Sequence, residues 1–213
     1  MANPTIKELN NKEKYELIAE LNHQQIKEFV VNRLAEGGRL VKVFMIYQVI
    51  MIALGIVITV HSVLLSIRNH HHEPLLNIIV AVMFSFTALV IIHELLHGVA
   101  IKLTGAPKIN YGAYFKKFIF YAEADRHVLN NKQFTFIALT PLVTIKVISI
   151  IGIILFFNYP AVYFITFIMC AHSLFCAGDI GLLSIFSEHG NDEIYTYDVK
   201  DEKKSYYFKK KMN

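Results

Sequence analysis

The sequence has few cysteines and only a slight excess of positive charge, and both scarcities exclude classes of protein. Only two of its 213 residues are cysteine, Cys170 and Cys176. Because they lie six positions apart in one apolar segment, they point in different directions on a helix, and we expect both to be reduced. Lys and Arg number 21 against 17 for Asp and Glu. This excess is too small and too segregated along the chain to indicate nucleic-acid binding.

Other absences narrow the range of functions. The sequence contains no tryptophan, no Ser-His-Asp arrangement, no phosphate-binding Gly loop, no nucleotide-binding motif and no internal repeat. It therefore gives no support to a serine hydrolase or a nucleotide-dependent enzyme. No cleavable signal peptide is expected, because about forty polar and charged residues precede the first apolar run. That run can itself act as a signal anchor.

Apolar residues are abundant and lie in long blocks. They make up 54% of the chain, and the mean hydropathy is positive. Four blocks each exceed the roughly 20 residues that a helix needs to cross a bilayer. These blocks cover residues 43–67, 75–101, 134–157 and 161–186. The sequence therefore predicts an all-α integral membrane protein with four transmembrane helices, in a domain that comprises residues 41–187.

Polar segments flank the predicted membrane domain. Residues 1–40 carry apolar side chains at helical spacing and predict one or two amphipathic helices, broken at Gly37-Gly38. They would form a cytoplasmic N-terminal region. Residues 188–213 would form a polar cytoplasmic tail, in which residues 193–197 could make a short strand before a solvated basic cluster.

The segment at 104–133 is the only sizeable loop between the predicted spans. Residues 108–124 are rich in Tyr, Phe and Ile, are interrupted by Gly112 and carry Lys116-Lys117 near their middle. This composition predicts a small cytoplasmic β-hairpin. The hairpin would either cover the helix ends or present a strand edge to an extended peptide.

The distribution of basic residues predicts the orientation in the cell membrane. The N-terminal region through Lys42 carries seven Lys and Arg, residues 102–132 carry six, and the chain from Lys200 onward carries six. The connection after the first span holds only Arg68, and the one at 158–160 holds none. Four spans would place the three basic regions on one side, which the positive-inside rule makes the cytoplasm. Both termini would then be cytoplasmic.

The stretch His93-Glu94-Leu95-Leu96-His97-Gly98, near the end of the second predicted span, is the candidate site for chemistry. Residues four apart lie on the same face of a helix, so His93 and His97 can bind one metal ion together. Glu94 is placed to take a proton from a metal-bound water. Ionisable groups inside a span cost a few kcal/mol and rarely persist without a partner or a function. The alternative, a polar cluster that holds helices together, does not explain the metal-site spacing.

A third metal ligand is expected on another span, because a catalytic zinc ion usually has three protein ligands and an open position for water. At about 1.5 Å per residue, His93 and His97 lie roughly 14 and 8 Å below the cytoplasmic border. Asp179 lies roughly 13 Å below it and His172 roughly 24 Å. Depth therefore favours Asp179 as the third ligand, with His172 as the alternative. Cys176, roughly 18 Å deep, shares their helix face and could line the same cavity.

Other ionisable residues in or near the spans have both a structural and a functional interpretation. Lys146 in the third span could reach the level of Glu94 and Asp179 and form a modulatory ion pair, or extend to the interface without a role. The tract His70-His71-His72 could bind metal, but a solvated turn fits better. His61 in the first span fits a hydrogen bond between packed helices better than a metal ligand.

Parts of the chain resemble a known family. The resemblance lies in His93–Gly98, the Pro107–Gly112 loop, the Leu139-Thr140-Pro141 turn and the stretch Ala177-Gly178-Asp179-Ile180. With these residues the chain is similar to a bacterial group of small membrane proteins described as "putative zincin peptidase", over roughly residues 75–200. More distantly it is similar to site-2-type intramembrane metalloproteases.

The resemblance implies roles for particular residues. In site-2-type proteases the two motif histidines and an aspartate on a later span hold zinc, and the motif glutamate activates water. Carried over, this implies that His93, His97 and Asp179 hold one Zn²⁺ ion and that Glu94 is the general base. Site-2 proteases usually carry Asp-Gly at the aspartate, whereas this chain has Asp179-Ile180.

The predicted function is a zinc-dependent endopeptidase that cleaves peptide bonds in or near the cytoplasmic leaflet. Its partners would be the lipid bilayer and a peptide or membrane-protein substrate. Two alternatives belong to other classes. One is a non-catalytic membrane adaptor in which the motif binds metal structurally or not at all. The other is a divalent-metal transporter, which His61, the outer His tract and His172 would favour.

Overall fold

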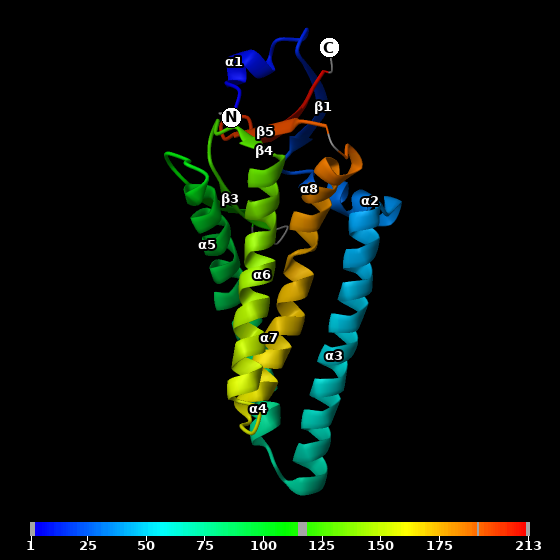
Figure 1. Ribbon diagram of the computed structural model, residues 1–213. Coiled ribbons are helices and arrows are strands. Elements are labelled where there is room, and N and C mark those ends of the chain that lie inside the picture. Colours follow the sequence, from blue (N-terminus) through cyan, green and yellow to red (C-terminus); the bar gives the residue numbers. More distant parts are fainter. Residues whose placement is uncertain (1–2, 115–118, 191, 212–213) are drawn as a thin grey trace. The chain divides into compact units, whose positions relative to one another are not determined.

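Helices make up most of the computed structural model, which describes residues 3–114, 119–190 and 192–211 (Figure 1). The helices are α1 (Ile6–Leu9), α2 (Ile26–Glu36), α3 (Arg39–Asn69), α4 (Glu73–Ser85), α5 (Ala88–Leu103), α6 (Asn131–Leu155), α7 (Ala161–Phe175) and α8 (Ala177–Glu188). The strands are β1 (Tyr15–Asn22), β2 (Asn110–Tyr114), β3 (Ile119–Glu123), β4 (Leu129–Asn130), β5 (Ile194–Val199) and β6 (Lys204–Lys210). The all-α prediction is therefore too simple, because antiparallel sheets accompany the helices.

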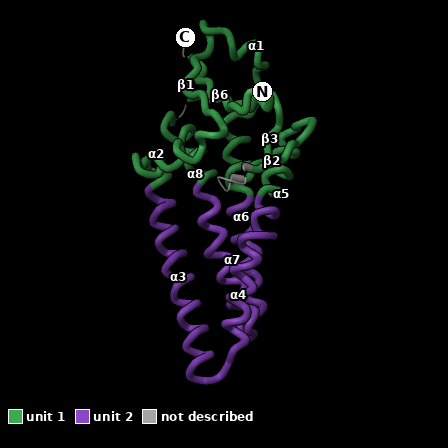
Figure 2. Tube along the Cα trace, turned by 180° about the vertical axis from the view of Figure 1, so that it is seen from behind, with its two compact units in different colours: residues 1–41, 94–140, 178–213 green, residues 42–93, 141–177 purple. Residues whose placement is uncertain are grey.

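The chain divides into two compact units (Figure 2). Unit 1 comprises Met1–Val41, Glu94–Thr140 and Gly178–Asn213, and contains all the strands. Unit 2 comprises Lys42–His93 and Pro141–Ala177, and consists of helices. Because α3, α5, α6 and α8 each run through a boundary, they contribute residues to both units.

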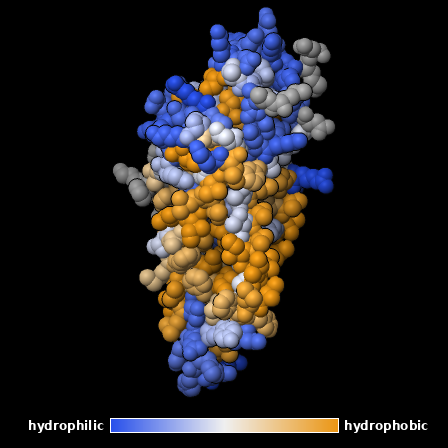
Figure 3. All heavy atoms as spheres, turned by 60° about the vertical axis from the view of Figure 1, so that its left-hand side comes forward, coloured by the Kyte–Doolittle hydropathy of each residue, from blue (hydrophilic) through white to orange (hydrophobic). Residues whose placement is uncertain are grey.

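Unit 2 exposes an unusually apolar surface. Figure 3 shows hydrophobic side chains covering its helices on the face in view. An 18-residue stretch of α3 has a mean hydropathy of 2.5 and is only 17% buried. Val43, Ile46 and Ile67 each expose more than half of their surface. Such a surface is unfavourable in water and favourable in lipid, which supports a membrane protein.

The two other predicted spans are interrupted. Among the described residues, α3 and α6 are long and apolar enough to cross a membrane, and up to four spans result if each bent pair, α4–α5 and α7–α8, is one span. At the first break Thr87 Oγ1 donates to the carbonyl of Met83, 2.8 Å away. At the second, Cys176 Sγ lies 3.4 Å from the carbonyl oxygen of His172. These side chains satisfy carbonyls near the interrupted helix ends, which lowers the cost of a break in an apolar segment.

Unit 1 contains a four-stranded antiparallel sheet, ordered β1-β6-β5-β4 among the described residues. Neighbouring residues of β6 point to opposite faces of this sheet. Phe208 packs in a cluster with Leu9 and Tyr197. Tyr207 instead packs against Phe134 of α6 and Phe186 of α8, whose two rings stack with centroids 4.5 Å apart. The sheet thereby packs against the first part of α6 and the last part of α8.

The N-terminal region differs from its prediction. Helices are present as α1 and α2, and α2 ends at Gly37, whose φ of 70° is left-handed, as the predicted break requires. Tyr15–Asn22, predicted as helix from the spacing of its apolar residues, instead forms β1. Its pairing with β6 satisfies backbone groups along one edge of the strand, which outweighs a weak helical preference. A register shift between Leu17 and Ala19 accommodates the irregular apolar spacing.

The strands predicted at 108–124 are present as β2 and β3. They pair antiparallel with Gly112 opposite Tyr121, and a Cβ at Gly112 would overlap the Tyr121 ring. The predicted Lys116-Lys117 pair lies outside the described residues. The strand predicted at 193–197 is present as β5. The basic residues after it are not merely a solvated cluster, because Lys204–Lys210 form β6.

Candidate metal centre

The His-Glu-x-x-His motif lies within one unbroken helix, α5. His93 and His97 are 5% and 8% exposed, so both imidazoles occupy the buried face. Leu95 and Val99, on the opposite face, expose about half of their surface. The helix therefore turns apolar side chains outward and its two imidazoles inward, as the spacing of four predicts.

His97 contacts α6 and α8 through its two ring nitrogens. Its Nδ1 lies 3.0 Å from the carbonyl oxygen of Ile137, and its Nε2 lies 3.1 Å from Oδ1 of Asp179. A carbonyl oxygen only accepts, so Nδ1 carries a proton and donates it to Ile137. Nε2 can then meet the carboxylate favourably only through a second proton or a metal ion. Two ligand atoms at about 2 Å from a tetrahedral zinc lie about 3.3 Å apart, so the pair fits a shared ion.

Asp179 occupies the first turn of α8, directly after the break at Cys176. Its side chain is 17% exposed. Gly181 lets α8 approach α2 closely, because a Cβ at Gly181 would lie 2.9 Å from Cγ1 of Val30. This close packing and the Phe186 stack fix the start of α8 within unit 1. The sequence prediction that Asp179 shares the level of the motif agrees with its contact to His97.

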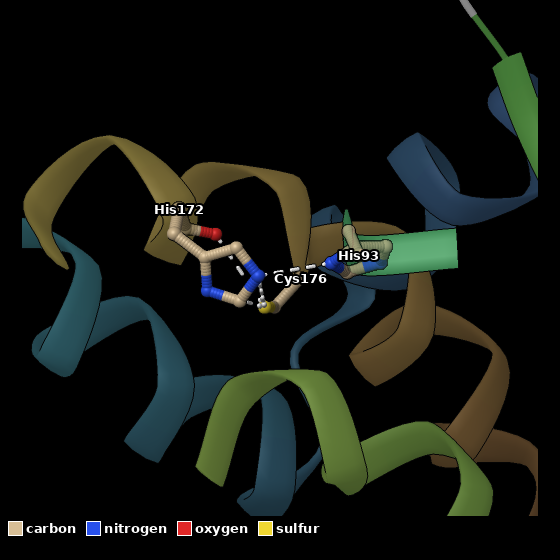
Figure 4. A group of neighbouring side chains, drawn as sticks. All are labelled: His93, His172 and Cys176. Atoms are coloured by element: carbon tan, nitrogen blue, oxygen red, sulfur yellow. Dashed lines mark hydrogen bonds between the residues drawn. The ribbon is translucent and has the colours of Figure 1, made fainter. Parts of the chain in front are cut away.

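His93 contacts a side chain of α7. Its Nδ1 lies 3.0 Å from Nε2 of His172, which is only 1% exposed (Figure 4). Nδ1 of His172 lies 3.7 Å from Sγ of Cys176, a residue with no exposed surface. One assignment of protons satisfies all these contacts. The Cys176 thiol donates to the carbonyl of His172, and His172 Nδ1 donates to the Cys176 sulfur. His93 Nδ1 then donates to His172 Nε2. Both motif histidines then use Nδ1 as a donor, which makes Nε2 the metal-binding nitrogen.

Glu94 is half-buried and follows His93 directly on α5. Its carboxylate interacts electrostatically with His97. A carboxylate next to two metal-binding imidazoles can accept a proton from a bound water.

Tyr111 is a neighbour of the motif that sequence reasoning misses. A Cβ at Gly98, the residue after His97, would overlap the Tyr111 hydroxyl, so β2 rests directly on α5 at this glycine. Tyr111 remains 52% exposed. The strand β2 therefore starts beside the motif, and its antiparallel partner β3 ends there. No periodic pattern in the sequence signals this contact, and none signals the carbonyl of Ile137.

The other ionisable residues and thiols discussed in the sequence analysis make contacts outside the motif. Lys146 Nζ lies 2.9 Å from Met51 Sδ and 4.7 Å from the centre of the Tyr47 ring, so its contacts within unit 2 are a soft sulfur and an aromatic face. A modulatory ion pair of Lys146 stays a prediction. His61 accepts or donates a hydrogen bond with Tyr163, 2.7 Å away on α7, which confirms a helix-packing role. Cys170 and Cys176 are both free thiols, as predicted.

A second polar cluster, which the sequence analysis misses, lies in unit 1. His23 and Glu123 are 5% and 4% exposed, and His23 Nε2 lies 3.2 Å from Ser205 Oγ. Ser205 donates to Oδ1 of Asp198 at 2.5 Å. The hydroxyl proton therefore goes to a carboxylate and not to the imidazole, so the group is not a serine nucleophile with its base. Burial, reinforced by the charge of Asp198, raises the pKa of Glu123 to about 7.

The chain is thus a helical protein with an apolar surface and with His93, His97 and Asp179 grouped as side chains that could hold a metal ion. A family model described as "Putative zincin peptidase" matches residues 86–194, just over half of the chain, and the chain belongs to this family. The matched region includes the motif, His172, Cys176 and Asp179. No curated protein and no solved structure matches the chain significantly. The family points to a zinc metallopeptidase, and two imidazoles with a carboxylate are donors that suit zinc.

Proposed function

We propose that this protein is a zinc-dependent, membrane-embedded endopeptidase that cleaves peptide bonds in or near the cytoplasmic leaflet. The observation that carries the proposal is the contact of His97 Nε2 with Asp179 Oδ1, 3.1 Å apart, while His97 Nδ1 donates to a backbone carbonyl. Such a pair of donor atoms suits a cation between them. His93, one turn earlier on the same face of α5, would complete three protein ligands and leave a fourth position for water.

The proposed topology has four spans, α3, the bent pair α4–α5, α6, and the bent pair α7–α8. With this topology the basic N-terminal region, the 102–132 segment and the basic tail lie on the cytoplasmic side, as the positive-inside rule requires. The motif near the end of α5 then lies below the cytoplasmic surface. Breaks in two of the spans support a site at this depth, because irregular backbone in a membrane occurs where it lines a polar or water-filled space.

The proposed mechanism uses few residues of the chain. When bound, a zinc ion would lower the pKa of a coordinated water and polarise the scissile carbonyl. The carboxylate of Glu94 takes the proton of that water and passes it to the nitrogen of the leaving amine. Ile137 and His172 orient the two imidazoles through their Nδ1 hydrogen bonds, and Asp179 supplies the negative charge that offsets the cation.

A substrate must expose its backbone before it can be cleaved. A transmembrane helix hides its peptide groups in internal hydrogen bonds, so the scissile segment has to unwind. The β2–β3 pair lies directly against α5 at Gly98, and its strand edges would hold an unwound segment by main-chain hydrogen bonds. The proposed substrate is therefore an extended peptide or an unwound segment of a membrane protein.

The first test separates metal binding from catalysis. The purified protein in detergent is expected to hold one zinc ion per chain, measured by elemental analysis. His97→Ala should lose that ion, because it removes a ligand. His61→Ala is the matched control, since His61 bonds to Tyr163 outside the motif. Loss of zinc from both variants, or from neither, would contradict the proposed ligand.

The second test concerns Glu94. Glu94→Gln should keep the zinc ion but lower cleavage of a co-reconstituted single-span substrate by at least about 100-fold, the usual contribution of a general base. Glu73→Gln is the control, because Glu73 lies in the first turn of α4 away from the motif. Unchanged cleavage by Glu94→Gln would falsify the mechanism.

A further inference from the structure

The chain contains a second group of metal-ligating side chains, and it overlaps the first at one residue. His93, His172 and Cys176 all belong to unit 2, and one ligand atom of each lies within 4.8 Å of the other two (Figure 4). Nδ1 of His93 lies 3.0 Å from Nε2 of His172, and Sγ of Cys176 lies 4.0 Å from that same nitrogen. In a tetrahedral zinc site two nitrogen ligands are about 3.3 Å apart and a nitrogen and a sulfur about 3.5 Å. Shifts of about 0.5 Å or less would therefore bring these two separations to the values of a zinc site.

The local structure holds these side chains near one another. His172 and Cys176 are one turn apart at the end of α7, so they share a helix face. All three residues are at most 5% exposed. Burial excludes water from the ligands and so favours a bound ion that the protein itself coordinates.

The donor set differs in kind from that of the proposed catalytic site. A thiolate with two imidazoles is softer than two imidazoles with a carboxylate, and soft ligands favour thiophilic ions such as Cd²⁺ and Cu⁺. Binding releases the thiol proton of Cys176, because the thiolate is the ligand.

We propose that His93 Nδ1, His172 Nε2 and Cys176 Sγ form a second metal site, selective for thiophilic ions, that withdraws His93 from the catalytic zinc. A neutral imidazole has one lone pair, and its other nitrogen carries a proton. When His93 binds an ion through Nδ1, Nε2 is protonated and cannot ligate zinc. The two ions therefore compete for one ring. Loss of the catalytic zinc would inhibit cleavage, and this consequence rests on the proposed function. The existence of the second metal site does not.

Cys170 provides a matched control for the thiol. It is buried on α7 and faces α3, since a Cβ at Gly55 would lie 3.4 Å from the Cys170 Cβ, and it is not among the three grouped ligands. Cys170→Ser and Cys176→Ser thus each replace a buried sulfur by oxygen, and only the second removes a proposed ligand.

The experiment adds Cd²⁺ to the purified zinc-loaded protein in detergent. One equivalent is expected to bind with a thiolate-to-cadmium charge-transfer band in the ultraviolet and to release one equivalent of zinc, measured by elemental analysis after gel filtration. Cys170→Ser should behave in the same way. Cys176→Ser should lose the band and keep its zinc against one equivalent of Cd²⁺. His97→Ala, which lacks the catalytic zinc ligand, should still give the band.

Specific outcomes would overturn the proposal. If zinc is released from Cys176→Ser as readily as from the wild type, Cd²⁺ merely replaces zinc at the catalytic ligands. If His97→Ala loses the band, there is one site and not two. Cadmium NMR of the wild-type protein gives a test that needs no variant, because a cadmium shift without sulfur coordination also excludes the site. A failure of the peptidase hypothesis would appear differently, as cleavage that survives Glu94→Gln, and it would leave the band unchanged.

Discussion

At the scale of single residues, the hydrogen-bond partner of each Nδ1 determines which nitrogen of a motif histidine can bind metal. For His97 the partner is the carbonyl of Ile137, which can only accept, so the tautomer is fixed by the backbone. For His93 the partner is another imidazole, His172, which can accept or donate. The two histidines are equivalent in the sequence motif and differ in the structure. His97 has one metal-binding nitrogen, and His93 can expose either.

Glu123 makes a residue-scale prediction outside the motif. Its pKa is raised from 4.5 to about 7, chiefly by burial, so the folded state binds this proton more tightly than the unfolded chain does. The resulting stabilisation is full below pH 4.5 and is lost as the pH rises through about 7. Glu123→Gln keeps the neutral shape and removes the charge. We expect the variant to be more stable than the wild type above pH 7 by roughly 1–3 kcal/mol, at about 1.4 kcal/mol per pKa unit, and similar to it near pH 4.5.

Thermal unfolding of both proteins across this pH range measures the difference. Glu193→Gln is a suitable control, because the ion pair of Glu193 with Lys210 lowers the pKa of that exposed carboxyl. Glu193→Gln should make the protein slightly less stable at neutral pH, which is the opposite of the effect expected for Glu123→Gln. A Glu123→Gln difference that is the same at every pH would refute the buried-charge explanation.

At the scale of elements, Gly98 decides whether β2 can lie on α5. A Cβ at this position would overlap the end of the Tyr111 ring, so Gly98→Ala must displace this side chain from the surface of α5. Overpacking costs about 1–3 kcal/mol, and the better helix propensity of alanine offsets about 1 kcal/mol of it. We expect a net loss of up to about 2 kcal/mol in the stability of the folded protein, read as a lower unfolding temperature.

Two variants give this prediction its controls. Gly178→Ala places the same methyl group where no atom lies within 4 Å, so it should leave stability unchanged or raise it. Tyr111→Ala combined with Gly98→Ala removes the obstacle and should restore most of the lost stability. If the double variant is as unstable as Gly98→Ala, the strand does not depend on this contact.

The elements also show what a single sequence can and cannot predict. Long apolar blocks, the motif helix and the strands at 108–124 follow from composition and periodicity, because those signals are local. The breaks at Thr87 and Cys176 do not, since they depend on side chains that bond to nearby carbonyls inside apolar runs. The strand β1 is misread as helix because its stabilising partner, β6, lies at the other end of the chain. The contact of His97 with Asp179 could be anticipated, because the two residues lie at similar predicted depths. The hydrogen bond of His97 to the carbonyl of Ile137 could not, because it depends on the packing of α5 against α6.

At the scale of the whole molecule, charge and apolar surface support the same topology. Basic residues concentrate in three segments that contribute to unit 1, and the connections within unit 2 carry almost none. Apolar side chains cover α3 and the other helices of unit 2. A bilayer around these helices would bury that surface and leave the basic segments at one aqueous side.

This topology predicts which residues a reagent can reach from outside an intact cell. Asn158→Cys lies in the exposed connection between α6 and α7, and Asp201→Cys lies in the exposed turn between β5 and β6. A membrane-impermeant maleimide should label Asn158→Cys in intact cells and Asp201→Cys only after permeabilisation, because an even number of spans keeps the basic tail inside. The two native cysteines should add little background, since Cys170 is 6% exposed and Cys176 has no exposed surface. Labelling of Asp201→Cys in intact cells would require either an inverted orientation or an odd number of spans. Either result would move the tail to the outer side and would remove the basis for placing the motif beneath the inner surface.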